Sequence, residues 1–588
     1  MRLSALDVAV VVLYLAAIVT IGLAVKRRAA RGLESYFLGE RRLPWWALAM
    51  SGSSSYFDIT GTMWIVSLFV VLGLRGMWVQ WIWGFVISVF YAAYMGRWIR
   101  RSSLMTGSEW MLFRFGATSG ADAARLAYTV YAILTVTAFL AFAAVGMGKF
   151  TSVFVDVNPH LAASCVVALT GLYVIVGGFQ GMILVEVMQT LILSTGALLV
   201  CYLGYANFDP ARFRVPAQWW SLAPIKTADY VSDPAYYFFG LLVLVYLTKG
   251  IFLCLSGPEQ LFDFQRFLAA RNARDAQKLG ALWGVIHTIR WPMAMAIAVL
   301  ALLGSASGFR EMLSRDPERA LPLVLANYLP RGVTGLAIAA LLSGFLATFS
   351  SNVNAGASYL VKDVYKRYIN PRADDRRLVR ASYAASTLLV AAGLLISFFA
   401  QSINLMFLWI MGTLGAGVLV PNVLRWYWWR INGWGYACGA FAGMALSLLQ
   451  VIAETLWLGA IPLYLSFPVI VALVCAITVA VSLATPPAPL EQLSEFYRRT
   501  SVWGAWGPVA RAAAREAGFR RESSPGRDLG TVLLGLPFLI ALYLGPIYLV
   551  LHRWPSALCC AAVACLFALL LYFQWYRKAL PPPDELHC

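Results

Sequence analysis

Long apolar runs alternate with short polar loops along almost the whole chain. An α-helix needs about 20 predominantly apolar residues to cross a bilayer. Runs of that order lie near 5–26, 46–74, 77–99, 122–148, 160–177, 182–204, 236–257, 279–305, 333–362, 378–400, 403–427, 433–455, 461–484, 530–551 and 556–576. The pattern therefore predicts an all-α polytopic membrane protein with about 15 transmembrane helices.

One of these runs is interrupted by polar residues. It extends from Trp45 to about Gly73, and its first half contains SGSSSYFDITG at 51–61. Lipid offers no hydrogen-bond partner to backbone groups that a break in a helix releases, so such a segment must line a protein-enclosed cavity. Discontinuous helices surround the binding sites of many transporters. The interruption therefore predicts a solute or ion pathway.

Composition and charge agree with a membrane location. Of the 588 residues, 60% are hydrophobic and 13% are charged, and the net charge is +18. The basic residues lie in short loops between apolar runs, which is the distribution of the positive-inside rule and not of a nucleic-acid-binding domain. We expect no nucleic-acid partner. We expect a plasma membrane protein, favouring a bacterial inner membrane, with an outside N-terminus and a cytoplasmic C-terminus.

The chain offers no pattern typical of catalysis. Its histidines are dispersed along the sequence, at positions 160, 287, 552 and 587, and the cysteines show no metal-ligand spacing. No Ser/His/Asp set suggests a nucleophile. We expect that the protein is not an enzyme.

Several stretches resemble the sodium:solute symporter family. In chain order they are YFLGERRLPWW (36–46), GGFQGMILVEVMQ (177–189), FQRFLAARNARDAQK (264–278), SSNVNAGASYLVKDVYKRY (350–368), WWRINGWGYACGAFAG (428–443) and FYRR (496–499). Glu186 stands where family members usually have Asp. The resemblance implies a LeuT-type core of two inverted five-helix repeats, a known transporter design.

The same resemblance implies how the chain is divided. The segments are an N-terminal extra helix and cytoplasmic loop (1–45), a first five-helix repeat (46–204), a second, inverted five-helix repeat (236–427), two peripheral helices (433–484), a basic cytoplasmic segment (485–529), and two C-terminal helices with a tail (530–588). We expect the basic segment to lie near anionic lipid.

The resemblance also implies a sodium site between the broken first core helix and the eighth. On the eighth helix the matching positions are Gly344, Ala347 and Thr348, which share one face. Gly344 offers a carbonyl and Thr348 a hydroxyl, and oxygen ligands suit a hard cation. Ala347 departs from the family, whose members mostly place a second hydroxyl there. Na+ is the expected coupling ion.

The register on the broken helix has two alternatives. Counting from the preceding proline resembles the sugar transporters and places the ligating carbonyls at Ser54 and Phe57, whereas matching DITG to the proline transporter places them at Tyr56 and Ile59. Either register puts Asp58 at or beside the site. Asp58 then has an ion or proton role, or it caps the second half-helix.

Four residues are candidates for the solute site. Gln80 stands where sugar and proline transporters place a Glu beside Trp, and His287 lies on the seventh core helix. Thr413, on the tenth, is a candidate cavity hydroxyl. The packing alternative for Gln80 is a hydrogen bond between helices.

Lys249 is the fourth candidate and the clearest departure from the family. It lies in the middle of a predicted span, where a lysine must pair or stay neutral. It could form an internal ion pair with Asp58 or Glu186, act as counter-charge for an anionic solute, or snorkel to the interface.

Together these features predict a secondary active transporter that couples Na+ to a small polar organic solute, such as an amino acid, carboxylate or sugar, by alternating access. One alternative is a proton-coupled or uncoupled transporter of the same fold, and another is a solute-binding membrane sensor without net transport. The expected partners are the solute and the lipid bilayer, with no obligate protein partner.

Overall fold

The structure is a computed structural model. It describes residues 3–29, 43–83, 85–102, 107–155, 157–224, 236–257, 261–304, 313, 315–400, 402–454, 456, 459, 461–515 and 524–577. Within these ranges the chain is helical, and β structure is limited to an isolated bridge between Trp428 and Ala505. The all-α prediction is confirmed.

The α-helices have the following bounds: α1 (Ala5–Ala29), α3 (Trp45–Ser54), α4 (Ile59–Leu72), α5 (Gly76–Val79), α6 (Ile87–Phe90), α7 (Gly96–Arg101), α8 (Glu109–Phe115), α9 (Ser119–Phe154), α10 (Pro159–Asn207), α11 (Phe239–Ser256), α12 (Leu261–Ala269), α13 (Ala273–His287), α14 (Arg290–Leu303), α16 (Ala320–Tyr328), α17 (Val333–Ser358), α18 (Asp375–Ser397), α19 (Ile403–Leu408), α20 (Gly415–Tyr427), α21 (Gly433–Ala453), α22 (Leu463–Ala484), α23 (Leu490–Thr500), α24 (Gly507–Ala513), α25 (Pro525–Val550) and α26 (Trp554–Leu571). Short 3₁₀ turns (η2, Gly73–Arg75; η3, Gln80–Trp83; η5, Ala217–Trp220; η7, Pro317–Arg319) and π-helical turns (η4, Tyr91–Met95; η8, Tyr359–Ile369; η9, Trp409–Leu414; η11, Tyr572–Tyr576) connect or extend them.

Among the described residues, 12 helices are long and apolar enough to cross a membrane, and two shorter apolar stretches cover Ala5–Ile18 and Pro159–Ala168. This agrees with a polytopic membrane protein. The runs at 160–177 and 182–204, predicted as two spans, are one continuous helix, α10. No proline lies between residues 160 and 207 to end the helix, which is the physical reason that two apolar runs join here.

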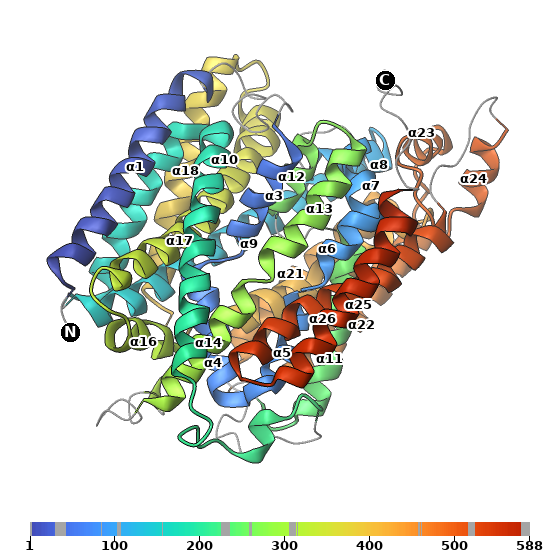
Figure 1. Ribbon diagram of the computed structural model, residues 1–588. Coiled ribbons are helices and arrows are strands. Elements are labelled where there is room, and N and C mark those ends of the chain that lie inside the picture. The colour runs from blue at the N-terminus through green and yellow to red at the C-terminus, as the bar shows by residue number, and fades with distance from the viewer. Residues whose placement is uncertain are drawn as a thin grey trace.

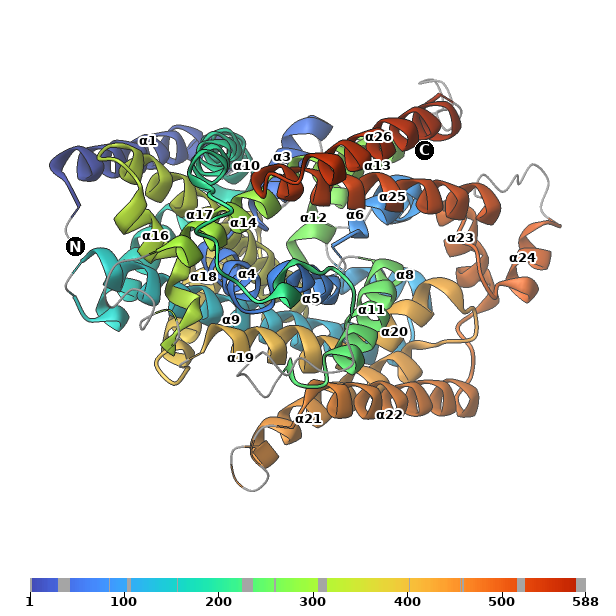
Figure 2. The ribbon, with the colours of Figure 1, turned by 60° about the horizontal axis from the view of Figure 1, so that its bottom comes forward.

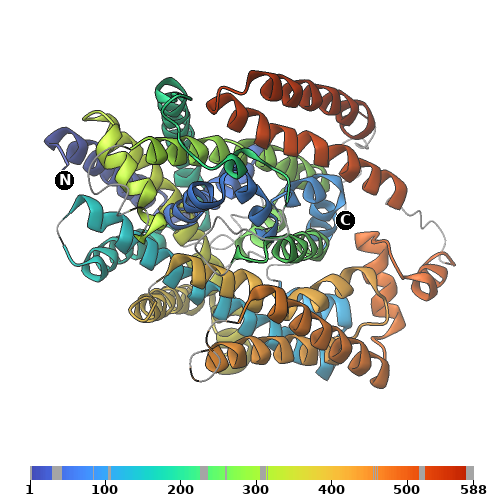
Figure 3. The same cartoon turned by 90° about the horizontal axis from the view of Figure 1, so that it is seen from below.

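The helices form a bundle with α3 and α4 near its centre (Figure 1). The α25–α26 hairpin and the α21–α22 pair lie on opposite faces of that bundle (Figures 2 and 3). In α17 and in the span that starts with α4, 83% of the most apolar window is buried, whereas the value for α26 is 6%. The polar break at 51–61 is therefore central, and α26 presents most of its apolar surface to the outside of the bundle.

The span predicted at 77–99 is irregular. It passes from η2 through α5, η3, α6 and η4 to α7 without forming one regular helix. Gly73, at the turn into this region, has a φ of +62°, and a Cβ there would overlap the backbone of Trp219. Glycine is the residue that adopts such a conformation without strain.

The basic segment after residue 485 docks on the bundle. Phe496 and Trp506 are fully buried and stack at an interplanar angle of 23°, and the Arg114 guanidinium of α8 lies 5.2 Å and 4.6 Å from their ring centroids. The described part of the segment is thus held against the bundle by aromatic and cation–π contacts, and its proximity to anionic lipid stays a prediction. Its aromatic residues stand between arginines in the sequence and form a small hydrophobic core. The charge pattern of the segment did not predict that core.

Candidate functional site

The helix break brings backbone oxygens to the face of α17. Helix α3 ends at Ser54 and α4 begins at Ile59, so the carbonyls between them lack regular helical partners. The Thr348 hydroxyl donates to the Ser55 carbonyl at 2.6 Å and to the Gly344 carbonyl at 3.0 Å. Gly344 lies so close to the break that a Cβ there would overlap the Phe57 carbonyl. Released carbonyls and a hydroxyl therefore meet at one point.

The register at the break follows neither predicted alternative in full, since Phe57 of the first alternative faces α17 together with Ser55, which belongs to neither. The Ser54 carbonyl accepts from the Phe57 N–H at 2.9 Å, and the Tyr56 carbonyl accepts from the Arg290 guanidinium. Ser55 and Phe57 are the residues whose carbonyls reach α17. Ser55 was missed because spacing along the sequence does not determine how far a helix unwinds.

Asp58 takes the capping position. It is the N-cap of α4, where its side chain accepts from the Gly61 N–H at 2.6 Å. The other carboxylate oxygen lies 3.3 Å from the Arg290 guanidinium, and both side chains are buried. This is the geometry of the capping alternative, with a buried cation to balance the charge. Arg290 begins α14 directly after the turn that ends α13.

A second buried ion pair lies beside the break. Glu186 of α10 and Arg266 of α12 are both fully buried, with 3.0 Å between carboxylate and guanidinium. The guanidinium also donates to the hydroxyls of Ser55 (2.6 Å) and Ser351 (2.7 Å), and the Ser51 hydroxyl donates to Glu186. We call these five residues the Glu186–Arg266 cluster. It ties α3, α10, α12 and α17 together.

Asp58 and Glu186, the two carboxylates predicted as partners of Lys249, are each paired with an arginine. The ammonium group of Lys249 is fully buried, which excludes snorkelling, and donates to the Ile82 carbonyl at 2.8 Å. That carbonyl belongs to η3. A Cβ at the neighbouring Gly250 would overlap the Trp81 carbonyl, so α11 approaches η3 closely. Lys249 therefore satisfies backbone released in an irregular span.

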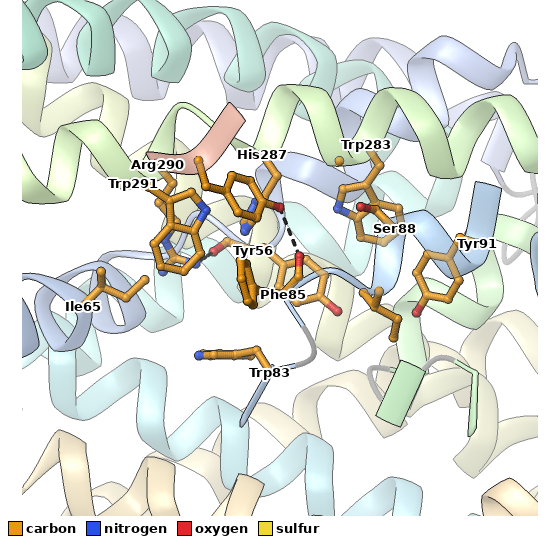
Figure 4. Close-up of a pocket in the computed structure, with 13 residues that line it drawn as sticks. Tyr56, Ile65, Trp83, Phe85, Ser88, Tyr91, Trp283, His287, Arg290 and Trp291 are labelled. Carbon is orange, nitrogen blue, oxygen red and sulfur yellow. Dashed lines mark hydrogen bonds between the residues drawn. The ribbon is translucent and has the colours of Figure 1, made fainter. Parts of the chain in front are cut away.

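A small aromatic cavity lies beside the break (Figure 4). Tyr56, Trp83, Phe85, His287 and Trp291 surround it, together with Arg290. The His287 ring is edge-on to Tyr56 at 5.7 Å and to Trp291 at 6.2 Å. The cavity brings the predicted solute residue His287 next to the broken helix.

Several buried polar atoms at this cavity have no hydrogen-bond partner among the described residues. They include the Nε atom of Arg290, the Nε1 atoms of Trp83 and Trp291, and the Nδ1 atom of His287. The arginine and tryptophan nitrogens are hydrogen-bond donors. Burying such donors without a partner costs free energy, and each one calls for an explanation.

Gln80 shares this property. Its side chain is fully buried, and neither amide atom has a partner among the described residues. Gln80 and Trp83 stand at the ends of η3, and residues i and i+3 of a 3₁₀ turn lie on one face. This placement does not match the packing alternative, in which the amide bonds another helix. Thr413 lies in η9, and its side chain is outside the described residues.

Comparison with known proteins assigns the chain to a family. The model of the sodium:solute symporter family matches residues 36–446, which include the broken helix, the cavity residues up to Trp291, and α17. The chain belongs to the sodium:solute symporter family. Its members couple transport to Na+, and Na+ is the coupling ion here.

Individual relatives are distant but cover most of the chain. The sodium/glucose cotransporter of Vibrio parahaemolyticus is 22% identical over 480 residues, which are 76% of this chain and 85% of that protein. Sodium/glucose cotransporter 4 of Danio rerio is 25% identical over 557 residues, or 84% and 80% of the two chains. Sodium/myo-inositol cotransporter 2 of Bos taurus is 25% identical over 543 residues, or 84% and 78%. These relatives are transporters and not enzymes.

A solved structure supports the fold. The substrate-bound outward-open state of a Na+-coupled sialic acid symporter superposes with a TM-score of 0.62 at 18% identity, and the match covers 83% of this chain and 99% of that one. The LeuT-type fold predicted from the resemblance is confirmed. The protein is therefore a multi-pass membrane transporter of this family.

Proposed function

We propose that the protein is a sodium-coupled symporter in which Na+ binds between the helix break and α17. The observation that carries this is the convergence of the Ser55 and Phe57 carbonyls with the Thr348 hydroxyl at Gly344. These are hard oxygen donors of the kind that Na+ accepts. Asp58 is left out of the proposed ligand set, because the Gly61 N–H and Arg290 engage its oxygens. A main-chain oxygen or water takes the place of the hydroxyl that Ala347 lacks.

The solute we propose is an uncharged, oxygen-rich molecule of sugar or polyol type. The residues that line the cavity combine aromatic rings with N–H donors on Trp83, Trp291 and Arg290 that have no partner among the described residues, a mixture that suits a ring bearing many hydroxyl oxygens. Lys249 and Arg290 already contact backbone or carboxylate oxygens, which reduces the case for an anionic solute. The names of the relatives, glucose and myo-inositol cotransporters among them, lie in the same solute class.

In this mechanism Na+ fixes the two half-helices against α17, and that fixation shapes the neighbouring cavity. Tyr56 belongs to both sites, since it lies within the break and also lines the cavity. Solute and ion therefore raise one another's affinity, as symport requires. The Glu186–Arg266 cluster holds α12 against the break until the repeats rock to the other side. We place the N-terminus outside and the C-terminus in the cytoplasm, following the loop charges.

The test is uptake into proteoliposomes that contain the purified full-length protein. Radiolabelled D-glucose, D-mannose and myo-inositol are offered under an inward Na+ gradient, under a matched K+ gradient, and under a proton gradient. Accumulation in Na+ alone, lost in Thr348→Ala, supports the proposal. Thr334→Ala is the matched control, because Thr334 is a buried threonine of the same helix that bonds only carbonyls near its own N-terminus.

The same assay separates the alternatives. Accumulation driven by a proton gradient would show that transport is coupled to protons and not to Na+. Equilibration that is equal in Na+ and K+ would show uncoupled transport. Saturable solute binding without accumulation would favour a sensor.

A further inference from the structure

The C-terminal hairpin contributes a wall to the solute cavity. Tyr543 of α25 lines the cavity, whereas every other lining residue falls between Tyr56 and Trp291. Residue 543 lies nearly 100 positions beyond the end of the family match at 446. A segment outside the shared transporter core thus reaches the site that we assign to the solute.

Tyr543 is held in a defined position there. Its side chain is 1% exposed, and its hydroxyl donates to the Phe85 carbonyl at 3.1 Å. Its ring centroid lies 5.2 Å from that of Phe85 and 5.6 Å from that of Trp291. The Phe85 carbonyl belongs to the irregular backbone between η3 and α6, so it needs a donor at membrane depth. The tyrosine supplies that donor and an aromatic face together.

The helix that carries Tyr543 packs tightly against the core. A Cβ at Gly535 of α25 would overlap the Val89 side chain of α6, so the Val89 side chain packs directly on the α25 backbone. One turn later along α25, Leu539 lines a neighbouring groove with Ser88 and Gly284. Tyr543, a further turn on, is therefore fixed over α6 and α14 and does not hang from a loose terminal helix.

We propose that Tyr543 is a specificity-determining residue, which limits the size of the uncharged, oxygen-rich solute that the cavity admits. This inference rests on the proposed function. The cavity is small, and Tyr543 closes the side on which it adjoins the C-terminal hairpin. Removal of the ring opens that side, whereas the unpaired donors on Trp83 and Trp291 stay in place.

The test compares two solutes in one assay. The first is whichever of D-glucose, D-mannose and myo-inositol the wild-type protein accumulates best in Na+ proteoliposomes, and the second is its O-methyl derivative. One methyl group in a pocket changes specificity by about 10-fold or more. We expect Tyr543→Ala to shift the ratio of kcat/KM values about 10-fold toward the methylated solute. Tyr548→Ala, on the same helix but not lining the cavity, is the matched control with an unchanged ratio.

The outcomes are distinct. An unchanged ratio in Tyr543→Ala, with uptake intact, overturns the inference and leaves the proposed function standing. If Tyr543→Ala does not fold, Tyr543→Leu keeps an apolar side chain without the ring, and its ratio decides in the same way. If the wild-type protein accumulates none of the three solutes, the proposed solute class fails and the role of Tyr543 falls with it.

Discussion

At the scale of single residues, the site depends on atoms that the sequence alone leaves ambiguous. Gly344 and Thr348 follow from a motif and a helical repeat, because both lie on one face of a regular helix. The partner carbonyls lie in unwound backbone, where no periodicity applies. Ser55 therefore could not be separated from Ser54 by counting. The side chain of Gln80 was identified from its position, and its missing partners became visible only in three dimensions.

A methyl group at Gly344 should abolish ion coupling. In Gly344→Ala the new Cβ would overlap the Phe57 carbonyl and push the break away from α17. We expect saturable binding of radioactive sodium to be lost and Na+-driven uptake to fall at least about 10-fold, which corresponds to about 1.4 kcal/mol. Gly171→Ala is the control, because its Cβ would meet only Val390 at 3.6 Å. Equal sodium binding in the two variants would contradict the proposed site.

At the scale of helices and their contacts, buried ion pairs position the broken helix. Arg266 lies in helix α12, within a stretch between two apolar runs whose basic residues resemble ordinary positive-inside charge, so its burial against Glu186 was not predictable from composition. The capping alternative for Asp58 was predictable from local sequence, because Asp before a helical run is a strong N-cap signal. Its pairing with Arg290, 232 positions away, was not.

Breaking the Glu186–Arg266 pair should destabilise the protein strongly. Arg266→Met leaves a buried carboxylate without its cation, and we expect a loss of about 3–5 kcal/mol. The double variant Arg266→Met, Glu186→Gln removes both charges and should recover part of that loss. The measurement is thermal unfolding in detergent. In the exposed pair Arg498–Glu495, Arg498→Met should cost at most about 1 kcal/mol. Additive effects of the two Glu186–Arg266 changes would contradict the coupling.

At the N-cap of α4, the effect of the Asp58 charge can be measured separately from that of its hydrogen bond. Asp58→Asn keeps an acceptor for the Gly61 N–H but removes the negative charge that pairs with Arg290. We expect lower stability and uptake in this variant, and partial recovery when Arg290→Gln is added. Asp374→Asn is the control, since Asp374 caps α18 at an exposed position. If the double variant is no better than Asp58→Asn, the ion pair has no role in holding the break.

At the scale of the whole molecule, the C-terminal third is integrated into the transporter. The order of spans and the LeuT-type core followed from apolar runs and motifs, because membrane-spanning length is a strong local signal. The docking of α23, α24 and α25 could not be predicted from these signals, since those contacts join segments hundreds of residues apart. Asp528, at the start of α25, accepts from Arg97 of α7 at 3.1 Å and from the Trp503 indole at 3.2 Å.

Removal of the contacts that Asp528 makes with Arg97 and Trp503 should loosen the C-terminal part without unfolding the core. In Asp528→Asn the ion pair between Asp528 and the buried Arg97 is lost, and we expect faster amide deuterium exchange in 503–515 and 525–535. Exchange in α17 should stay unchanged. The exposed pair Asp209–Arg212 provides the control Asp209→Asn, with no change in either region. Equal amide exchange rates in Asp528→Asn and in the wild-type protein would show that the Asp528 contacts do not hold the C-terminal part.

The two buried pairs, Asp58 with Arg290 and Glu186 with Arg266, have an electrical consequence. Each pair sums to zero, so a movement of either one through the membrane field transfers no charge. A membrane potential acts on a single transferred charge with about 2.3 kcal/mol per 100 mV. With an uncharged solute, the sodium ion then contributes a charge that couples the cycle to this potential. Hyperpolarisation should therefore accelerate uptake even when the sodium concentrations on both sides are equal.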